Sequence, residues 1–426
     1  MKWTEPSKIF ALSVIFICLP LFGMGFWYMI GVNPFKPITI NGDKELAKYS
    51  SRGTGTTDDP YIVEGINHKK MLIIKNTESY FILQYCKIQT TGDGIRLAYI
   101  RNNTATLRYN TLINCSILLY SSDGVDVINN SFSGLGGLQI GASSFLSIYN
   151  NSFENYGISF VDEYYGPGYF SDYVPFVFDY ANNTIADLEI EFFFNYSNSI
   201  INEQYGQIFL LKCSNITIQN QQIRNAKIGI FVYRTNSCVI SNCEFDNCYY
   251  GIYAQYVVGF DFYNNTFCYE LYSSSSLIIF ECSSGTISNN SFIGADNFMG
   301  IRLYNSKNFT ISRNFLQGCT QGLFFEYCES ILIWKNHIEH TFYQAVFVMD
   351  STSLIFYQNN FILSDITDDE LSQASEHSCT SILWYNVTLS IGNYWNTWSG
   401  TGWYKIATST DNYDKFPLTN PVDIYS

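Results

Sequence analysis

The stretch Phe260–Phe267 reads Phe-Asp-Phe-Tyr-Asn-Asn-Thr-Phe, and it returns as Gly-Thr-Ile-Ser-Asn-Asn-Ser-Phe at Gly285–Phe292. Related segments end at Phe132 and Phe153. Each segment has an alternating apolar pattern, which is typical of a strand with one buried face. Each then passes through an Asn-rich corner to a closing apolar residue. This recurrence predicts one structural unit repeated along the chain.

The closing apolar residue sets the length of the unit. Within two blocks separated by a break it returns every 20 to 25 residues, at Ile66, Ile88, Leu112, Phe132 and Phe153 and then at Ile223, Phe245, Phe267, Phe292, Leu316, Ile338 and Phe361. Short strands at this spacing leave no room for crossover helices, so each unit must be one coil whose strands pair with those of the next coil about 4.8 Å away. The sequence predicts an all-β fold, a single-stranded right-handed parallel β-helix of roughly 13 coils.

A column of asparagines lies two residues before the closing positions. Its members are Asn110, Asn130, Asn151, Asn183, Asn265, Asn290, Asn314, Asn336 and Asn359. Asn tolerates the left-handed backbone of a tight corner, and stacked amides can hydrogen-bond from coil to coil. The column also creates many Asn-x-Ser/Thr signals as a by-product of the fold. Asn195, Asn308 and Asn386 lie off the column and are the better glycosylation candidates.

Twelve cysteines would suggest disulfides in a secreted protein. The repeat argues against them, because Cys86 and Cys243 fall in the Asn column, and Cys213, Cys282 and Cys328 fall where other coils have Ser. No column places two cysteines on adjacent coils, and a bridge needs Cα atoms within about 7 Å. The sequence therefore predicts small buried thiols that are mostly unpaired.

The N-terminus predicts a membrane segment. Lys2 and Lys8 precede a run without charge from Ile9 to Val32, long enough as a helix to cross a core of about 30 Å. We interpret residues 1–8 as cytoplasmic, 9–32 as a transmembrane signal anchor, 33–52 as a linker and 53–426 as the β-helix outside the cytoplasm. This makes a single-pass protein of the cell membrane. A cleaved signal peptide is the alternative, since Gly23-Met24-Gly25 has the small-x-small spacing of a cleavage site.

Two side insertions interrupt the coils, near 158–210 and 364–380. The first contains a cluster of tyrosines and carboxylates, a composition that suits stacking on a sugar and bonding its hydroxyls. The predicted ligand-binding residues are Asp162, Glu163, Tyr164, Tyr165, Tyr169, Asp172 and Tyr173. A loop that only packs on the coils would have the same composition.

Charge and motifs limit the other functions. The net charge is -14 and no basic run could track phosphates, which argues against nucleic acid as a partner. The pair His337 and His340 is predicted to be a surface pair, not a metal site, and no cofactor is expected. If the protein is a hydrolase or a lyase, its catalytic carboxylates could lie together on one face of the coils. The candidates are Asp93, with Arg96 near it, Asp123, Asp126 and Asp162.

Three segments together carry a family resemblance. Gly53–Ile62 is similar to the cap that leads into the first coil, the Asn-Asn-Ser/Thr-Phe units are similar to the repeats, and Gly392–Trp395 with Asp414–Leu418 is similar to the closing motif of NosD-like right-handed β-helix repeat proteins. The resemblance runs from about residue 37 to the end of the chain. It implies a surface protein of a group that includes sugar-binding and sugar-cleaving members and a copper-assembly accessory protein.

Three hypotheses of function follow. The leading one is a membrane-anchored, extracytoplasmic solenoid that binds surface glycans or has a structural role. The alternatives are an enzyme of the polysaccharide lyase or hydrolase kind and a copper-assembly accessory protein. The repeats are degenerate and specify the fold better than an activity. The sequence therefore favours a function without catalysis and leaves an enzyme as an alternative.

Overall fold

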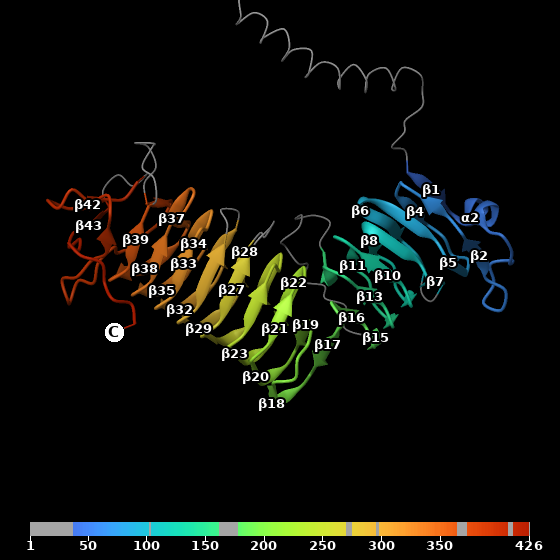
Figure 1. The fold of residues 1–426 in the computed structure, drawn as a ribbon, viewed down its shortest axis with the longest axis horizontal. Helices are drawn as coiled ribbons and strands as arrows, with labels where there is room; N and C mark the ends of the chain where they lie inside the picture. Colours follow the sequence, from blue (N-terminus) through green and yellow to red (C-terminus); the bar gives the residue numbers. More distant parts are fainter. Residues whose placement is uncertain are drawn as a thin grey trace, which may run out of the picture.

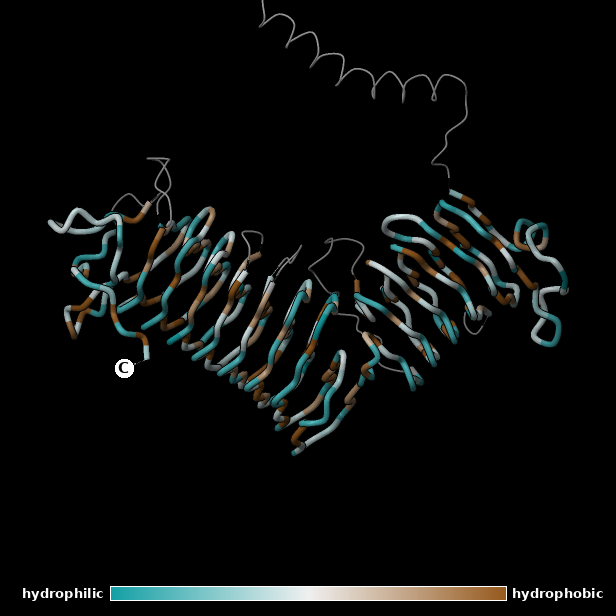
Figure 2. The backbone as a smooth tube through the Cα atoms, viewed as in Figure 1, coloured by the Kyte–Doolittle hydropathy of each residue, from teal (hydrophilic) through white to brown (hydrophobic). Residues whose placement is uncertain are grey.

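The computed structural model describes residues 37–101, 104–161, 178–269, 275–294, 298–363, 373–407 and 412–425. Over these residues the chain forms a β-helix, drawn as a bent rod in Figure 1. Figure 2 shows hydrophobic and hydrophilic residues alternating along the coils, as the repeat predicted. The inward side chains form one continuous core from Ile40 to Ile406.

Each coil has three faces, which we number in chain order. The first-face strands are β1 (Ile38–Asn41), β4 (Leu72–Lys75), the second halves of β6 (Lys87–Ala98) and β8 (Thr111–Tyr120), β11 (Gly137–Gly141), β14 (Gly157–Phe160), β17 (Leu188–Phe194), β19 (Gln207–Leu211), β22 (Ile228–Tyr233), β25 (Tyr250–Gln255), β28 (Ser275–Phe280), β31 (Met299–Tyr304), β34 (Gln321–Glu326), β37 (Gln344–Met349) and β40 (Ala374–His377).

The second face contains a six-stranded and an eight-stranded sheet, close to the roughly 13 coils expected from the repeat. Its strands are β2 (Tyr61–Glu64), β5 (Phe81–Gln84), β7 (Ala105–Arg108), β9 (Asp126–Ile128), β12 (Leu146–Tyr149) and β15 (Phe178–Ala181), then β18 (Ser197–Ile201), β20 (Ser214–Gln219), β23 (Asn236–Ser241), β26 (Val258–Tyr263), β29 (Ser283–Ser288), β32 (Lys307–Ser312), β35 (Glu329–Trp334) and β38 (Thr352–Tyr357).

The third face holds the closing apolar residues. Its strands are β3 (Asn67–His68), the first halves of β6 and β8, β10 (Ser131–Ser133), β13 (Ser152–Phe153), β16 (Thr184–Ile185), β21 (Gln222–Arg224), β24 (Glu244–Asp246), β27 (Thr266–Tyr269), β30 (Ser291–Gly294), β33 (Phe315–Gln317), β36 (His337–Glu339), β39 (Asn360–Ile362) and β41 (Tyr394–Trp395).

The register of the third face confirms the predicted column with one exception. Phe245, Phe267, Phe292 and Leu316 pair in succession, each fully buried. In the first coil, His68 pairs with Ile88, so His68 and not Ile66 holds the closing position. Ile66 lies two residues before that position, in the column that other coils fill with asparagine.

The predicted ladder of hydrogen-bonded asparagines is confirmed. The residue with the left-handed backbone of the corner, however, is not the one that was predicted. Asn314 donates from Nδ2 to Asn336 Oδ1 at 2.9 Å, and the same contact repeats along both blocks up to Asn393. The ladder asparagines do not have positive φ. The left-handed residue is the one before them, such as Asn264 with a φ of 56° and Asn289 with a φ of 54°. The Asn-Asn pair thus divides two tasks, with the first residue turning the chain and the second bonding between coils.

The cysteines form no disulfide among the described residues, as predicted. Nine of those eleven thiols are buried. Cys213 and Cys282 occupy a second ladder in which the backbone N of each donates to a Thr or Ser oxygen of the next coil. Because their neighbours in that column are Thr235 and Ser306, two thiols never lie on adjacent coils there.

The rod bends where the repeat breaks, between the block that ends at β16 and the block that begins at β17 (Figure 1). On one side the blocks touch directly, because Tyr156 N donates to Asn225 O at 2.7 Å and Lys227 N donates to Tyr156 O at 2.9 Å. On the other side β17 and β19 separate β14 from β22. Extra strands on one side only make a wedge, which bends the stack.

The side chain of Gln207 lies at the tip of this wedge. Its Nε2 donates to Ile158 O at 2.7 Å and to Ile228 O at 2.8 Å, and its Oε1 accepts from Ile158 N at 3.0 Å. The buried amide therefore replaces a peptide group where the two strands diverge. Gly157, at a φ of +65°, makes room for it, since a Cβ there would lie 2.4 Å from Gln207 Oε1.

Both ends of the core are closed. At the N-terminal end α2 (Asp43–Tyr49) buries Leu46 in the core, so part of the range predicted as a linker is structured. At the other end Asp414 Oδ2 accepts from Asn393 N at 2.7 Å and from Trp395 Nε1 at 2.9 Å. A Cβ at Gly392 would lie 1.9 Å from Asp414 Oδ1, so this contact requires glycine. The strands β42 (Tyr404–Lys405) and β43 (Tyr413–Asp414) pair antiparallel beside it.

The predicted fold class needs one correction. It combined the β-helix with an N-terminal transmembrane helix, and that part is wrong for the structure, because no helix among the described residues is long and apolar enough to cross a membrane. The segment predicted as the anchor, residues 9–32, lies outside the described residues. Over the described residues the fold class is a right-handed parallel β-helix with one short helix, α2, at its N-terminal end.

Candidate functional site

The ligand-binding residues predicted in the first insertion lie outside the described residues, which stop at 161 and resume at 178. This holds for Asp162, Glu163, Tyr164, Tyr165, Tyr169, Asp172 and Tyr173 alike. Their role stays a prediction. The larger part of the second insertion, 364–372, is likewise outside the described residues.

The carboxylates predicted to share a face do not come together. Asp93 starts the first-face part of β6, next to Arg96, whereas Asp126 lies on β9 of the second face. Asp123 lies between the two faces and accepts from Ser144 N at 2.6 Å, which gives it a structural role at a corner. A pair of hydrolytic carboxylates is therefore not formed by these three residues.

A pocket of about 190 Å³ lies at the bend, where the two blocks touch. It is lined by Leu135, Asn155, Tyr156, Asn225, Ala226, Asn247 and Tyr249. All of these residues come from the corners between the third and first faces, so their spacing follows from the stacking of coils. Tyr156 pairs with Ala226 across the junction between the two blocks. We call this the bend pocket.

The asparagine amides of the bend pocket already make hydrogen bonds within the protein. Asn247 Nδ2 donates to Asn225 Oδ1 at 2.9 Å, and Asn155 Nδ2 donates to Gly134 O at 3.3 Å. These bonds hold the side chains of Asn155, Asn225 and Asn247 in place. An array of oriented amides beside two tyrosine rings can bond sugar hydroxyls while the rings cover an apolar sugar face.

Lys227 lies against the two tyrosines. Its Nζ is 5.6 Å from the ring centroid of Tyr156 and 5.8 Å from that of Tyr249. Among the described residues no hydrogen bond or ion pair of this half-buried ammonium is found, and the two rings contribute cation–π contacts to it. A cation held in this way is available to an anionic or hydroxyl-rich ligand.

Asp93 and Lys227 are close enough for the charge of each to act on the pKa of the other. Burial lowers the pKa of Lys227, and the charge of Asp93 opposes that shift. Burial raises the pKa of Asp93, and the charges of Arg96 and Lys227 oppose it. An acid and a base whose pKa values are pushed toward each other are typical of functional sites.

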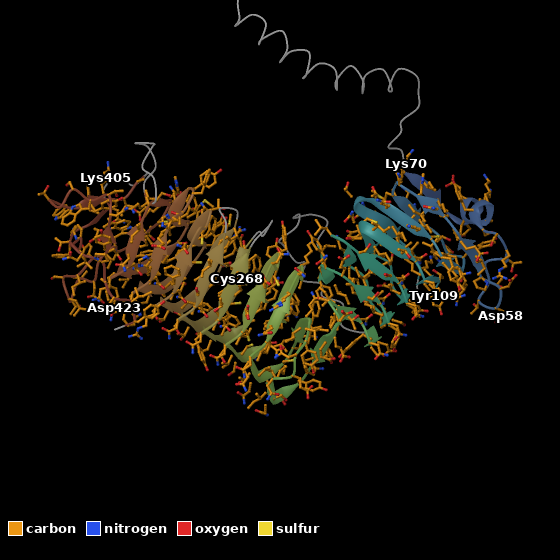
Figure 3. The ribbon with its side chains drawn as sticks, in the orientation of Figure 1. Asp58, Lys70, Tyr109, Cys268, Lys405 and Asp423 are labelled. Atoms are coloured by element: carbon orange, nitrogen blue, oxygen red, sulfur yellow. The ribbon has the colours of Figure 1, made fainter. Side chains whose placement is uncertain are left out.

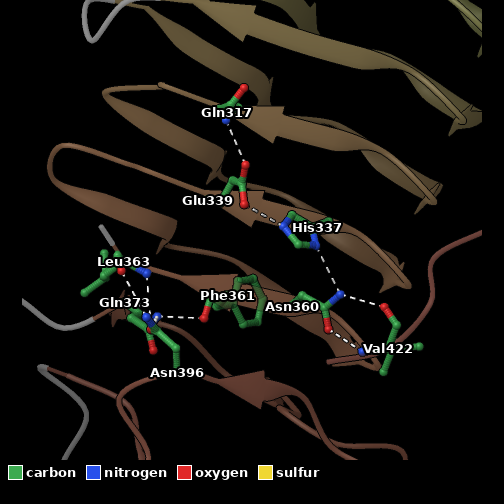
Figure 4. A network of polar contacts seen from close by, with 9 residues as sticks. All are labelled: Gln317, His337, Glu339, Asn360, Phe361, Leu363, Gln373, Asn396 and Val422. Atoms are coloured by element: carbon green, nitrogen blue, oxygen red, sulfur yellow. Dashed lines mark hydrogen bonds and ion pairs between the residues drawn. The ribbon is translucent and has the colours of Figure 1, made fainter. Parts of the chain in front are cut away.

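In the histidine pair predicted to be a surface pair, the side chain of His337 makes structural contacts (Figure 4). His337 Nε2 contacts Glu339 Oε2 at 3.0 Å, and its Nδ1 lies 3.3 Å from Asn360 Nδ2. Asn360 in turn bonds both backbone groups of Val422 at 2.7 Å, which holds the C-terminal segment on the coils. His340 is an exposed corner residue. No group of three His, Cys, Asp or Glu residues within the described ranges could hold a metal ion.

The glycosylation candidates differ in exposure. Asn195 and Asn308 are exposed and have positive φ, at corners of the coils, whereas Asn386 is half-buried and its Oδ1 accepts from Leu389 N. Modification of these residues stays a prediction.

Comparison with known proteins bears on the fold. The family model described as "Right handed beta helix region" matches residues 206–362. This match confirms a parallel β-helix repeat protein, and it does not single out NosD-like proteins. No curated protein sequence matches the chain.

Solved β-helix structures show a distant likeness. A variant of the periplasmic alginate epimerase AlgG is 12% identical, with 83% of this chain and 85% of that chain covered and a TM-score of 0.32. A complex of the alginate lyase AlyF-OU02 is 11% identical over 92% and 93% of the two chains, with a TM-score of 0.31. Bacteriophage CBA120 tailspike protein 3 is 11% identical over 79% and 57%, with a TM-score of 0.26. These low scores identify neither an activity nor a ligand for this chain.

Proposed function

We propose that this protein binds carbohydrate and that the bend pocket is a binding site. The observation that supports the proposal most strongly is the presence of two tyrosine rings, three asparagine amides and an adjacent lysine in one concave place. Sugar-binding sites need flat apolar surface for the ring face and oriented polar groups for the hydroxyls. The rigid coils hold both kinds of group in place before a ligand arrives, which lowers the entropy that binding costs.

The test is a double variant, Tyr156→Ala with Tyr249→Ala, measured against the glycans that the wild-type protein binds on an array. Each stacked ring contributes about 0.5 to 1.5 kcal/mol, so losing both should weaken binding roughly tenfold, or about 1.4 kcal/mol. The matched control is Tyr85→Ala with Tyr109→Ala. These two rings are 60% and 45% exposed and stack at 5.4 Å in the N-terminal block, where Figure 3 labels Tyr109.

The control should bind like the wild-type protein. If the double variant folds and binds glycan as well as the control does, the bend pocket is not the site. A triple variant of Tyr164, Tyr165 and Tyr169 to Ala then tests the insertion predicted from the sequence.

A second candidate is a polysaccharide-cleaving enzyme at the same place. It is favoured by the opposite pKa shifts of Asp93 and Lys227, since burial raises the pKa of the acid and lowers the pKa of the base. Incubation with acidic and neutral polysaccharides, followed by assay for new chain ends, tests it. Release of products that Lys227→Met abolishes would support the enzyme, and no release from any substrate would leave binding as the function.

A further inference from the structure

The polar network drawn in Figure 4 determines which nitrogen of the neutral His337 ring carries the proton. On one side of the ring, the carboxylate of Glu339 can only accept hydrogen bonds, and its Oε2 lies 3.0 Å from His337 Nε2. The other carboxylate oxygen, Oε1, accepts from Gln317 Nε2 at 2.8 Å, so both oxygens are held in place. The neutral imidazole therefore has its proton on Nε2 and an acceptor lone pair on Nδ1.

The other side of the ring leads to the same assignment independently. Val422 presents a backbone N–H, which can only donate, and a backbone C=O, which can only accept. Its N donates to Asn360 Oδ1 and its O accepts from Asn360 Nδ2, both at 2.7 Å, so these bonds fix the orientation of the amide. The remaining hydrogen of Asn360 Nδ2 is left for His337 Nδ1, 3.3 Å away, which must accept it.

A second proton on His337 is incompatible with this arrangement. An N–H on Nδ1 would face the N–H of Asn360 Nδ2, and the two donors would repel each other. Turning the amide over would offer Oδ1 to the imidazolium, but it would break both bonds to Val422. The imidazolium and the bound Val422 therefore exclude each other, whereas Glu339 can accept from Nε2 in both states.

The contact between Asn360 and Val422 holds the last part of the chain on the third face. The chain is anchored just before this part at Leu418, whose N donates to Asn393 O at 2.8 Å. Asn360 is buried where the segment crosses it, and Ile424 is buried further along the segment. Because Val422 is bonded to a side chain and not to the backbone of a strand, a change at that side chain can release the segment.

The ionisable groups on the elements that pack against His337 are few. Strands β33 and β39, which pair with β36 on either side, contain none. Glu339 lies on the same strand as His337, Lys335 lies at the corner before it, and the C-terminal segment contributes Asp423 and Tyr425. Carboxylates ordinarily titrate below about pH 5, and tyrosine and lysine above about pH 9. Histidine is the residue type in this group that ordinarily changes its charge between these values.

We propose that His337 and Asn360 form a pH-sensitive latch, in which protonation of His337 releases the segment 419–425 from the third face. The released segment stays attached at Leu418 and uncovers the amide of Asn360 together with the outer side of β39. The latch is separate from the bend pocket and does not depend on the function proposed there.

Amide hydrogen exchange of the peptide 418–425, followed by mass spectrometry, tests the latch. All proteins are compared with one another at the same pH, about 5 or about 8, so that the intrinsic pH dependence of exchange cancels. Asn360→Ala removes both bonds of the latch and is the reference for the released segment. His337→Gln keeps a donor for Glu339 and an acceptor for Asn360 but cannot gain a proton. The matched control is His340→Gln, at an exposed corner histidine.

At about pH 8 the wild-type segment should exchange at least tenfold more slowly than the segment of Asn360→Ala, and at about pH 5 within about threefold of it. His337→Gln should stay protected at both pH values, and His340→Gln should respond like the wild type. Equal protection of the wild-type segment at both pH values would overturn the proposal. So would loss of protection in His337→Gln at the lower pH, a lost pH response in His340→Gln, or no difference between Asn360→Ala and the wild type at the higher pH.

Discussion

Replacement of Gln207 by Leu tests the origin of the bend. Leu has a similar volume but neither donor nor acceptor, so the change leaves Ile158 N, Ile158 O and Ile228 O without the bonds that the amide makes. Each buried backbone group that loses its partner costs about 1 to 3 kcal/mol. With three groups at the low end of that range, we expect a loss of about 3 kcal/mol in the free energy of unfolding.

Urea denaturation measures this loss, with amide hydrogen exchange at Ile158 as the local probe. The local probe matters because solenoids can unfold block by block, so that a single global free energy is not always defined. The matched control is Gln222→Leu on β21, whose exposed side chain should make the change nearly neutral. If the Gln207 variant has wild-type stability and unchanged amide exchange at Ile158, Gln207 does not stabilise the wedge through these hydrogen bonds.

Gln207→Glu extends the test to pH. The carboxylate keeps an acceptor for Ile158 N but faces the carbonyl oxygens of Ile158 and Ile228 where the amide had donated. Burial and those oxygens favour the neutral acid, so the pKa of this Glu should be raised in the folded state. The stability of the variant should therefore be highest below the unfolded value of about 4.3 and fall as the pH rises.

Three further outcomes follow from buried or half-buried groups. Phe267→Ala should cost about 3 to 5 kcal/mol in urea denaturation, because the ring is fully buried between Phe245 and Phe292 at 4.7 and 4.8 Å; wild-type unfolding would contradict the core column. Among the described cysteines, alkylation of native protein at pH 8 should label mainly Cys268 and Cys379, since burial raises the pKa of Cys282 and Cys328 to about 12, and denaturation without reductant should expose the other described thiols. Resistance until reductant is added would mean disulfides. Lys227→Met should raise the melting temperature by an amount equivalent to roughly 1 kcal/mol, because it removes a half-buried cation without an ion pair; a lower melting temperature would show that the ammonium stabilises the fold.

The coils could be predicted because their signal is local. One segment such as Phe260–Phe267 contains a strand, its corner and a core residue, and the next copy of it confirms the period. The assignment of Ile66 went wrong in the first coil, which has only one neighbouring repeat to set its register. The left-handed residue was misplaced by one position because two adjacent asparagines share the corner.

The bend pocket could not be read from the sequence. Tyr156 and Lys227 belong to two different blocks, whose corners meet on one side while β17 and β19 lie between the blocks on the other, where Gln207 bonds backbone groups 49 and 21 residues away. The repeat break between Phe153 and Ile223 did mark the place. It was interpreted as an insertion alone, and the bend was not foreseen. The carboxylates Asp93 and Asp126 were predicted to share a face, whereas the coil places them on different faces.

The most direct measurement is a crystal structure of the protein with an oligosaccharide selected from the array. The proposal predicts a sugar in the bend pocket, with its ring against Tyr156 or Tyr249 and its hydroxyls within hydrogen-bond distance of Asn155, Asn225 or Asn247. An empty bend pocket in a crystal where the same oligosaccharide is ordered on another surface would contradict it.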